Sequence, residues 1–468
     1  MKISVLLAKF FIVTSLLLWL KTPLQAQDEL HQSYDLKPNA TISVANHSGF
    51  IHLTGWNENR VQLDAVKRGA REDFSAVEIK VVQSLDKLEI TTISPRSSWK
   101  SYRHVEVEYE LKVPRTAILN AITTTSGDIT ITDAGSRAIV RSTSGNITVH
   151  KIGGDTNLNS TSGNIVAAHI GGTLTINSTS GELRISDVAA RLSAQTTSGS
   201  ITALDLRDDV AVNAMSGDVR LEKIGGRVNA RAISGKLIVR DAGGDATLES
   251  ISDAILAENI KGRVTATAIS ADVTIRNVQE GVRTSSVSGN ILLANVKGLI
   301  EAKSTSGEIS LREVDSHEVL LNSHSGSVNY QGAIYDDGRY SFESFNGGVT
   351  IYVPANSNFN FSAKTFSGDI AADFPLKLNP GIISNNRPKR LQGTFGTENG
   401  AQLTASTFNA DIRLKKKERT SLSALTRSSL LTKLLQFLPL NTARITTLIR
   451  AIDICFGADC WCVQFPVK

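Results

Sequence analysis

Apolar and polar positions recur with a fixed period of 18 residues from residue 125 to residue 322, which makes 11 units without an insertion. In one representative unit, Ile147 and Val149 alternate with polar neighbours, as in a half-buried β-strand. The alternation breaks before Ile152, which predicts a bend, and resumes around Leu158, which predicts a second short strand. A period in this range is typical of solenoid proteins.

Each unit has two corners marked by small residues. Gly153-Gly154 marks the looser corner, because Ala189-Ala190 and Gln279-Glu280 stand at the equivalent positions. A Ser-Gly pair marks the stricter corner, since glycine takes positive φ without steric cost. The glycines of that corner are Gly127, Gly145, Gly163, Gly181, Gly199, Gly217, Gly235, Gly289 and Gly307.

One unit cannot bury its apolar face alone, because two short strands are marginal in water. Units stacked in parallel register, about 4.8 Å apart, would bury one continuous column: Ile129, Ile147, Ile165, Leu183, Ile201, Val219, Leu237, Ile255, Val273, Ile291 and Ile309. Residues 125–322 contain no aromatic residue and no proline, which fits a thin interior and an unbroken ladder. The sequence therefore predicts an all-β fold, a parallel β-solenoid (β-helix) with about 18 residues per coil.

Two other architectures stay open at this point. A left-handed β-helix of hexapeptide type also has 18-residue coils, but its apolar positions recur every six residues, unlike those here. A meander of hairpins would use the Gly-Gly pairs as tight turns. Strands of about six residues are too short for a membrane barrel, which needs roughly nine to eleven.

The chain divides into five predicted segments. Irregular coils flank the repeats, and a leucine-rich segment with helical spacing follows them. The segments are a signal peptide (1–26), an N-terminal cap with irregular coils (27–124), the regular coils (125–322), longer aromatic-rich coils (323–417), and a short helical, amphipathic, Cys-containing tail (418–468).

The first 26 residues have the features of a secretory signal. Lys2 precedes an apolar run from Phe10 to Leu20, and Leu24-Gln25-Ala26 has the pattern of a cleavage site. We therefore expect export to the periplasm, the outer-membrane surface or the extracellular space.

The net charge of +5 comes from the ends of the chain. Residues 27–414 hold 38 basic and 42 acidic side chains, a net charge of about −4. Nucleic acid is therefore not an expected partner of the repeats.

The tail contributes two further predictions. Its leucines suit an amphipathic helix in peripheral contact with a membrane, or one that covers the end of the solenoid. Its three cysteines, Cys455, Cys460 and Cys462, leave one thiol unpaired in an exported protein, and zinc binding is the alternative.

Aromatic residues return after the regular coils, ten of them from Tyr330 to Phe374. They either pack a thicker end of the solenoid or form a platform that binds a glycan or an envelope protein. The binding hypothesis names Tyr330, Tyr335 and Tyr340.

No constellation in the sequence indicates catalysis. The polar column that follows the Ser-Gly corner, from Asp128 to Glu308, suits side chains that cap turns, with calcium binding as the alternative. A second column from Asp133 to Asp241 suits a solvated face. Asp336-Asp337 is the one acidic pair in the irregular coils that we consider for catalysis, and it also suits a turn. We expect no enzymatic activity, no cofactor and no metal.

Three motifs carry a family resemblance: residues 42–49 (ISVANHSG), residues 109–114 (YELKVP), and the repeated Thr-Ser-Gly-Asp/Asn/Glu-Ile units. The chain resembles the bacterial putative-adhesin β-solenoid proteins of unknown function, a family similar to the head domain of autotransporter-type adhesins. The resemblance covers roughly residues 40–414 and implies an exported solenoid. It implies no catalytic residues.

The resulting hypothesis is a non-enzymatic envelope or cell-surface protein, an adhesin or binding scaffold. A polysaccharide-processing enzyme that uses the end coils and a self-assembling structural protein are the alternatives.

Overall fold

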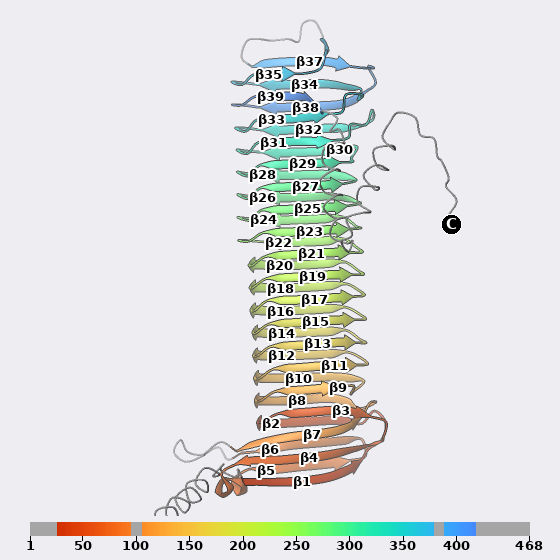
Figure 1. The fold of residues 1–468 in the computed structure, drawn as a ribbon, viewed down its shortest axis with the longest axis vertical. Coiled ribbons are helices and arrows are strands. Elements are labelled where there is room, and N and C mark those ends of the chain that lie inside the picture. The colour runs from red at the N-terminus through yellow and green to blue at the C-terminus, as the bar shows by residue number, and fades with distance from the viewer. Residues whose placement is uncertain (1–25, 95–104, 379–387, 418–468) are drawn as a thin grey trace, which may run out of the picture. The chain divides into compact units, whose positions relative to one another are not determined.

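A computed structural model describes residues 26–94, 105–378 and 388–417, all within one compact unit that extends to Lys417. In this part of the chain every regular element is a β-strand except the 3-10 helix Arg71–Ala76. The strands form two sheets in stacked coils (Figure 1), which confirms the predicted parallel β-solenoid. The predicted helical tail and residues 1–25 of the predicted signal peptide lie outside the described residues.

Each regular coil gives one strand to each sheet. Partners are parallel and 18 residues apart, as in Ile147 opposite Ile165. The first sheet contains β9 (Ile129–Thr132), β11 (Ile147–Ile152), β13 (Ile165–Ile170), β15 (Leu183–Val188), β17 (Ile201–Leu206), β19 (Val219–Ile224), β21 (Leu237–Ala242), β23 (Ile255–Ile260), β25 (Val273–Val278), β27 (Ile291–Val296) and β29 (Ile309–Val314).

The second sheet repeats this arrangement on the other side of the core, with Leu158 opposite Ile176. Its strands in this region are β8 (Ile118–Ser126), β10 (Arg137–Ser144), β12 (Thr156–Ser162), β14 (Leu174–Ser180), β16 (Leu192–Ser198), β18 (Val210–Ser216), β20 (Val228–Ser234), β22 (Ala246–Ser250), β24 (Val264–Ala268), β26 (Gly281–Ser286), β28 (Leu299–Ser304) and β30 (Glu318–Ser323).

The predicted apolar column lies in the core, and each of its residues is at most 1% exposed. The predicted bend is at Lys151, whose φ is +61°. This left-handed residue breaks the two-residue alternation, so that the next side chain, Ile152, is buried. Eleven coils have such a residue at this position, from Asp133 to Glu313, with φ between +49° and +61°.

The N-terminal end is interleaved. Strands β2 (Thr41–Ser48) and β3 (Ile51–Trp56) form one coil. On one side it pairs with the coil of β6 (Lys87–Ile93) and β7 (Glu106–Pro114), and on the other side with the coil of β8 and β9. Antiparallel strands extend both sheets beyond it: β4 (Arg60–Gly69) pairs with β7 and with β1 (Ala26–Asp35), and β5 (Glu78–Ser84) pairs with β6.

The C-terminal end is interleaved in the same way. The last described coil consists of β38 (Ala401–Thr407) and β39 (Ile412–Lys416). On one side it pairs with the coil of β32 (Arg339–Ser344) and β33 (Val349–Val353). On the other side it pairs with the coil of β34 (Phe359–Thr365) and β35 (Ile370–Ala372). Strand β31 (Val328–Gly332) joins β29 to β33, while β37 (Lys389–Phe395) pairs antiparallel with β34 and with β36 (Lys377–Leu378). A coil that is inserted between two others cannot fray independently of them.

No helix in the described part of the chain combines the length and apolarity that a membrane crossing requires.

Candidate functional site

Neighbouring coils approach one another closely at the Ser-Gly corner. From Gly127 to Gly235 its glycines have φ between +114° and +153°, a region that other residues rarely adopt. A Cβ added to Gly163 would lie 2.2 Å from the carbonyl oxygen of Gly145. The Gly145 N–H in turn donates to the carbonyl oxygen of Ser162 at 3.1 Å. Glycine is therefore required here by both conformation and space.

The side chain two residues before each corner glycine points outward, and successive coils align these side chains in one row, the corner row. The row begins with five threonines and becomes apolar and then aromatic. In stacking order its members are Thr125, Thr143, Thr161, Thr179, Thr197, Met215, Ile233, Ile251, Ile269, Val287, Thr305, His324, Phe345, Phe408 and Phe366.

The second part of the corner row leaves large apolar side chains in water. Six of them are between 38% and 49% exposed: Met215, Ile269, Val287, Phe345, Phe366 and Phe408. Ile233 and Ile251 are half-buried, and Thr305 and His324 stand between Val287 and Phe345. Exposed apolar side chains that gather along one row make that row a candidate interaction site.

The row ends in an aromatic ladder of four parallel rings, His324, Phe345, Phe408 and Phe366. Their centroids are 5.1, 4.9 and 4.7 Å apart in that order, and their planes differ by 9°, 6° and 3°. Because the inner ring faces cover one another, the ladder presents mainly ring edges to solvent. It therefore offers an apolar strip and few free ring faces for a sugar to stack on.

A groove of about 540 Å³ runs beside the aromatic ladder. The rings form one side of it, and polar side chains that include Asn322, Glu343 and Lys364 line the rest. The Asn322 amide donates to the Glu343 carboxylate at 3.0 Å. The groove suits a ligand with one apolar and one polar side.

The tyrosines named in the binding hypothesis lie elsewhere. Tyr330 and Tyr340 are 0% and 1% exposed, and their hydroxyls donate to the carbonyl oxygens of Ala333 and Ser316 at 2.7 and 2.8 Å. Burial raises the pKa of Tyr340 to about 12. These two rings pack the core, the alternative that the sequence left open, and neither presents a face to the surface.

Tyr335 is half-buried and stacks on His317, with centroids 4.1 Å apart. Its hydroxyl bonds the Asp315 carboxylate, which raises the tyrosine pKa. Asp336 and Asp337 are exposed in the adjacent turn, and Asp337 bonds the His317 ring at 2.8 Å. These groups form a small surface cluster around Tyr335.

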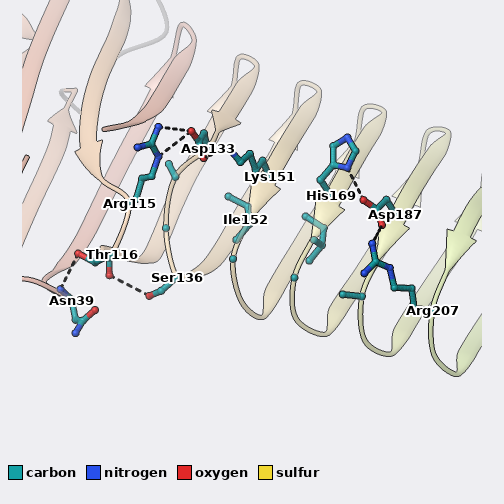
Figure 2. Close-up of a pocket in the computed structure, with 16 residues that line it drawn as sticks. Asn39, Arg115, Thr116, Asp133, Ser136, Lys151, Ile152, His169, Asp187 and Arg207 are labelled. Atoms are coloured by element: carbon teal, nitrogen blue, oxygen red, sulfur yellow. Dashed lines mark hydrogen bonds and ion pairs between the residues drawn. The ribbon is translucent and has the colours of Figure 1, made fainter. Parts of the chain in front are cut away.

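A second groove, of about 580 Å³, lies along the column of left-handed residues near the N-terminal end (Figure 2). Asp133 lies between Arg115 and Lys151, at 2.6 and 3.0 Å. Hydrogen bonds from Arg115 and then Lys151 lower the pKa of Asp133. The charges here neutralise one another from coil to coil.

The same pairing continues at Asp187, which bonds His169 at 2.7 Å and Arg207 at 3.1 Å (Figure 2). The hydrogen bond from His169 is the largest cause of the lowered pKa of Asp187. Across residues 26–94, 105–378 and 388–417, no three His, Cys, Asp or Glu side chains gather closely enough to hold a metal ion.

The polar column after the Ser-Gly corner bonds the neighbouring coil. The Asp128 carboxylate accepts the Asn146 N–H at 2.7 Å, and the Asn146 side-chain oxygen accepts the Asn164 N–H at 3.0 Å. These oxygens cap backbone donors of the next coil.

Comparisons with known proteins point to one family. The model of Toastrack DUF4097 matches residues 32–208 and 205–334. Among solved structures, the chain is similar to a putative cell adhesion protein from Clostridium sporogenes ATCC 15579, with 10% identity, 83% of this chain and 100% of that chain covered, and a TM-score of 0.14. It is also similar to a putative adhesin from Bacteroides fragilis NCTC 9343, with 13% identity and a TM-score of 0.15. That similarity covers 64% of this chain and 98% of the adhesin chain. TM-scores this low do not establish that either protein shares the structure or the function of this chain. No curated protein matches the chain.

Proposed function

The chain belongs to the Toastrack DUF4097 family. We propose that it is a non-enzymatic, exported β-solenoid of the cell envelope or cell surface that acts as an adhesin or binding scaffold. The corner row carries this proposal, because it holds six exposed large apolar side chains, whereas the apolar columns that face the core of the described coils are buried.

The geometry of the row supports an elongated contact. The row from Met215 to Phe366 occupies ten successive coils. Nine steps of about 4.8 Å between these coils make a strip of roughly 43 Å. The strip is one side chain wide and is held by the backbone ladder of every coil. A rigid strip loses little conformational entropy on binding, which favours affinity.

The partner is an envelope protein or a glycan.

Export depends on the predicted signal peptide, so cleavage after Ala26 would leave Gln27 as the mature N-terminus. Mass spectrometry of the protein recovered from the periplasm or medium tests this step, and an intact Met1 terminus in the cytosol would contradict it.

The proposal is tested by equilibrium binding of labelled mature protein to isolated cell envelopes. We expect saturable binding that weakens at least tenfold in the variant Phe345→Ser/Phe408→Ser, because two exposed anchors are removed. Leu85→Ser is the matched control, since Leu85 is 57% exposed but lies far from the row, in the turn between β5 and β6.

A parallel screen for reducing or unsaturated sugar ends addresses the enzyme alternative. Turnover that is lost in Asp336→Asn/Asp337→Asn would overturn the non-enzymatic proposal. Equal envelope binding by the phenylalanine variant and by wild type would remove the corner row from it.

A further inference from the structure

The first part of the corner row borders a groove of different chemistry. This hydroxyl groove, of about 540 Å³, runs from the coil of β2 to the coil of β14. Twelve of its thirteen lining residues are Ser, Thr or Asn, and Arg141 is the other. A site of this size can hold several sugar units or a comparable ligand.

Three parallel rows build the hydroxyl groove. Exposed threonines of the corner row, such as Thr161, form one wall, and outward-facing side chains of the second sheet, such as Asn159 and Asn177, form the other. The two asparagines bond each other at 3.2 Å, which fixes their amides. A row of small hydroxyl residues, including Ser160 and Ser178, forms the floor.

The floor contains hydroxyls that have no partner in the described residues. Ser142 and Ser178 donate to backbone carbonyls at 3.2 and 3.1 Å. In contrast, Thr124 and Ser160 are 5% and 7% exposed, and their hydroxyl oxygens make no hydrogen bond there. Buried hydroxyls in folded proteins are normally satisfied. These oxygens are closed off from solvent, and Thr196, one coil beyond the groove in the same row, shows the same state. The groups that face a ligand are therefore the exposed hydroxyls and amides of the two walls.

We propose that the hydroxyl groove binds a linear, neutral polysaccharide that lies along the stack of coils. Hydroxyl and amide side chains both donate and accept, as sugar hydroxyls do, and each coil from β8 to β14 contributes two adjacent Ser or Thr residues. A polyanion would require more cations than the single Arg141. An extended peptide would require free backbone groups, but corner N–H groups such as that of Gly145 are already bonded.

This inference rests on the proposed binding function and adds a ligand class and a second surface to it. It is separate from the aromatic ladder, which lies eleven or more coils further along the corner row than Thr125.

The test is affinity electrophoresis of the mature protein in gels that contain dextran, a soluble β-glucan, a galactomannan or, as the anionic comparison, alginate. We expect at least one neutral polymer to retard the protein and alginate not to. The variant Thr143→Val/Thr161→Val/Thr179→Val, which removes three exposed hydroxyls, should weaken that interaction at least about tenfold. Thr148→Val/Thr202→Val/Thr274→Val is the control, since these threonines face outward on the first sheet.

The outcomes separate this inference from the proposed function. Retardation that survives in Phe345→Ser/Phe408→Ser but not in the groove variant supports the hydroxyl groove. Retardation lost only in the phenylalanine variant assigns the polysaccharide to the aromatic ladder and overturns this inference alone. No retardation of a folded protein by any neutral polymer, or equal loss in the control variant, also overturns it, while envelope binding through the corner row would be unaffected.

Discussion

Two glycines of one coil should respond oppositely to the same substitution. Gly163 has φ +127°, and a Cβ there would lie 2.2 Å from the Gly145 carbonyl oxygen and 2.7 Å from its carbon. Gly153 has no positive φ, and the nearest atom to its added Cβ is 3.8 Å away. Gly163→Ala should therefore strain the backbone and push two coils apart, whereas Gly153→Ala should fit.

The structure sets the size of the difference. The unfavourable φ at Gly163 costs about 1–3 kcal/mol, and the overlap with a backbone that cannot move freely costs about 1–3 kcal/mol more. Gly153→Ala should instead gain about 0.4–1 kcal/mol, because alanine reduces the entropy of the unfolded chain. The free energies of unfolding of the two variants should thus differ by about 2.4–7 kcal/mol.

Urea denaturation of the mature protein, followed by far-ultraviolet circular dichroism, measures this difference. Wild type and both variants are compared at the same protein concentration and with a common m-value. Equal stability of Gly163→Ala and Gly153→Ala would refute the requirement for glycine at the Ser-Gly corner. A loss of stability in both would show that the space beside Gly153 does not accommodate a methyl group.

Three further variants or conditions test other parts of the fold. Ile201→Asp should destabilise the protein by about 4 kcal/mol or more in the same assay, because Ile201 is 0% exposed. Thr202→Asp on the outer face should change stability little. Equal effects of the two substitutions would contradict the inward position of Ile201. Glu313→Asn should stabilise by about 1 kcal/mol, because Asn277 and Asn295 hold the same left-handed conformation and bond along the stack at 2.7 Å, and a loss of stability would count against this ladder. Acidification should lower the urea midpoint, because the pKa values of Asp133 and Asp187 are lowered in the folded state; their contribution is present above the ordinary carboxyl pKa of about 3.9 and is lost as pH falls through the folded values. Asp133→Asn/Asp187→Asn should flatten that pH dependence.

The regular coils could be predicted because their information is local and periodic. The alternation of Ile147 and Val149, the bend before Ile152 and the strict glycine at Gly163 each specify one feature of every coil. Stacking then follows, since no coil can bury its apolar side alone.

The ends and the exposed rings could not be predicted in the same way. Phe408 lies between Phe345 and Phe366 because β38 is inserted between β32 and β34, a pairing that no local pattern encodes. The sequence does indicate the exposed phenylalanines by their position, because they stand where the first Ser-Gly corners have threonine, two residues before the corner glycine. Aromatic content does not reveal which face of a strand a ring occupies, and Tyr330 and Tyr340 face the core.

Site-specific photo-cross-linking tests most directly whether the corner row is where the protein meets its partner. A benzophenone amino acid would replace Val287 or Phe345 in the row, both exposed, or Leu85 outside it. After irradiation with isolated envelopes, we predict that both row positions cross-link to the same envelope component and that position 85 does not. Cross-linking that is equal at all three positions, or found only at position 85, would contradict a binding role for the corner row.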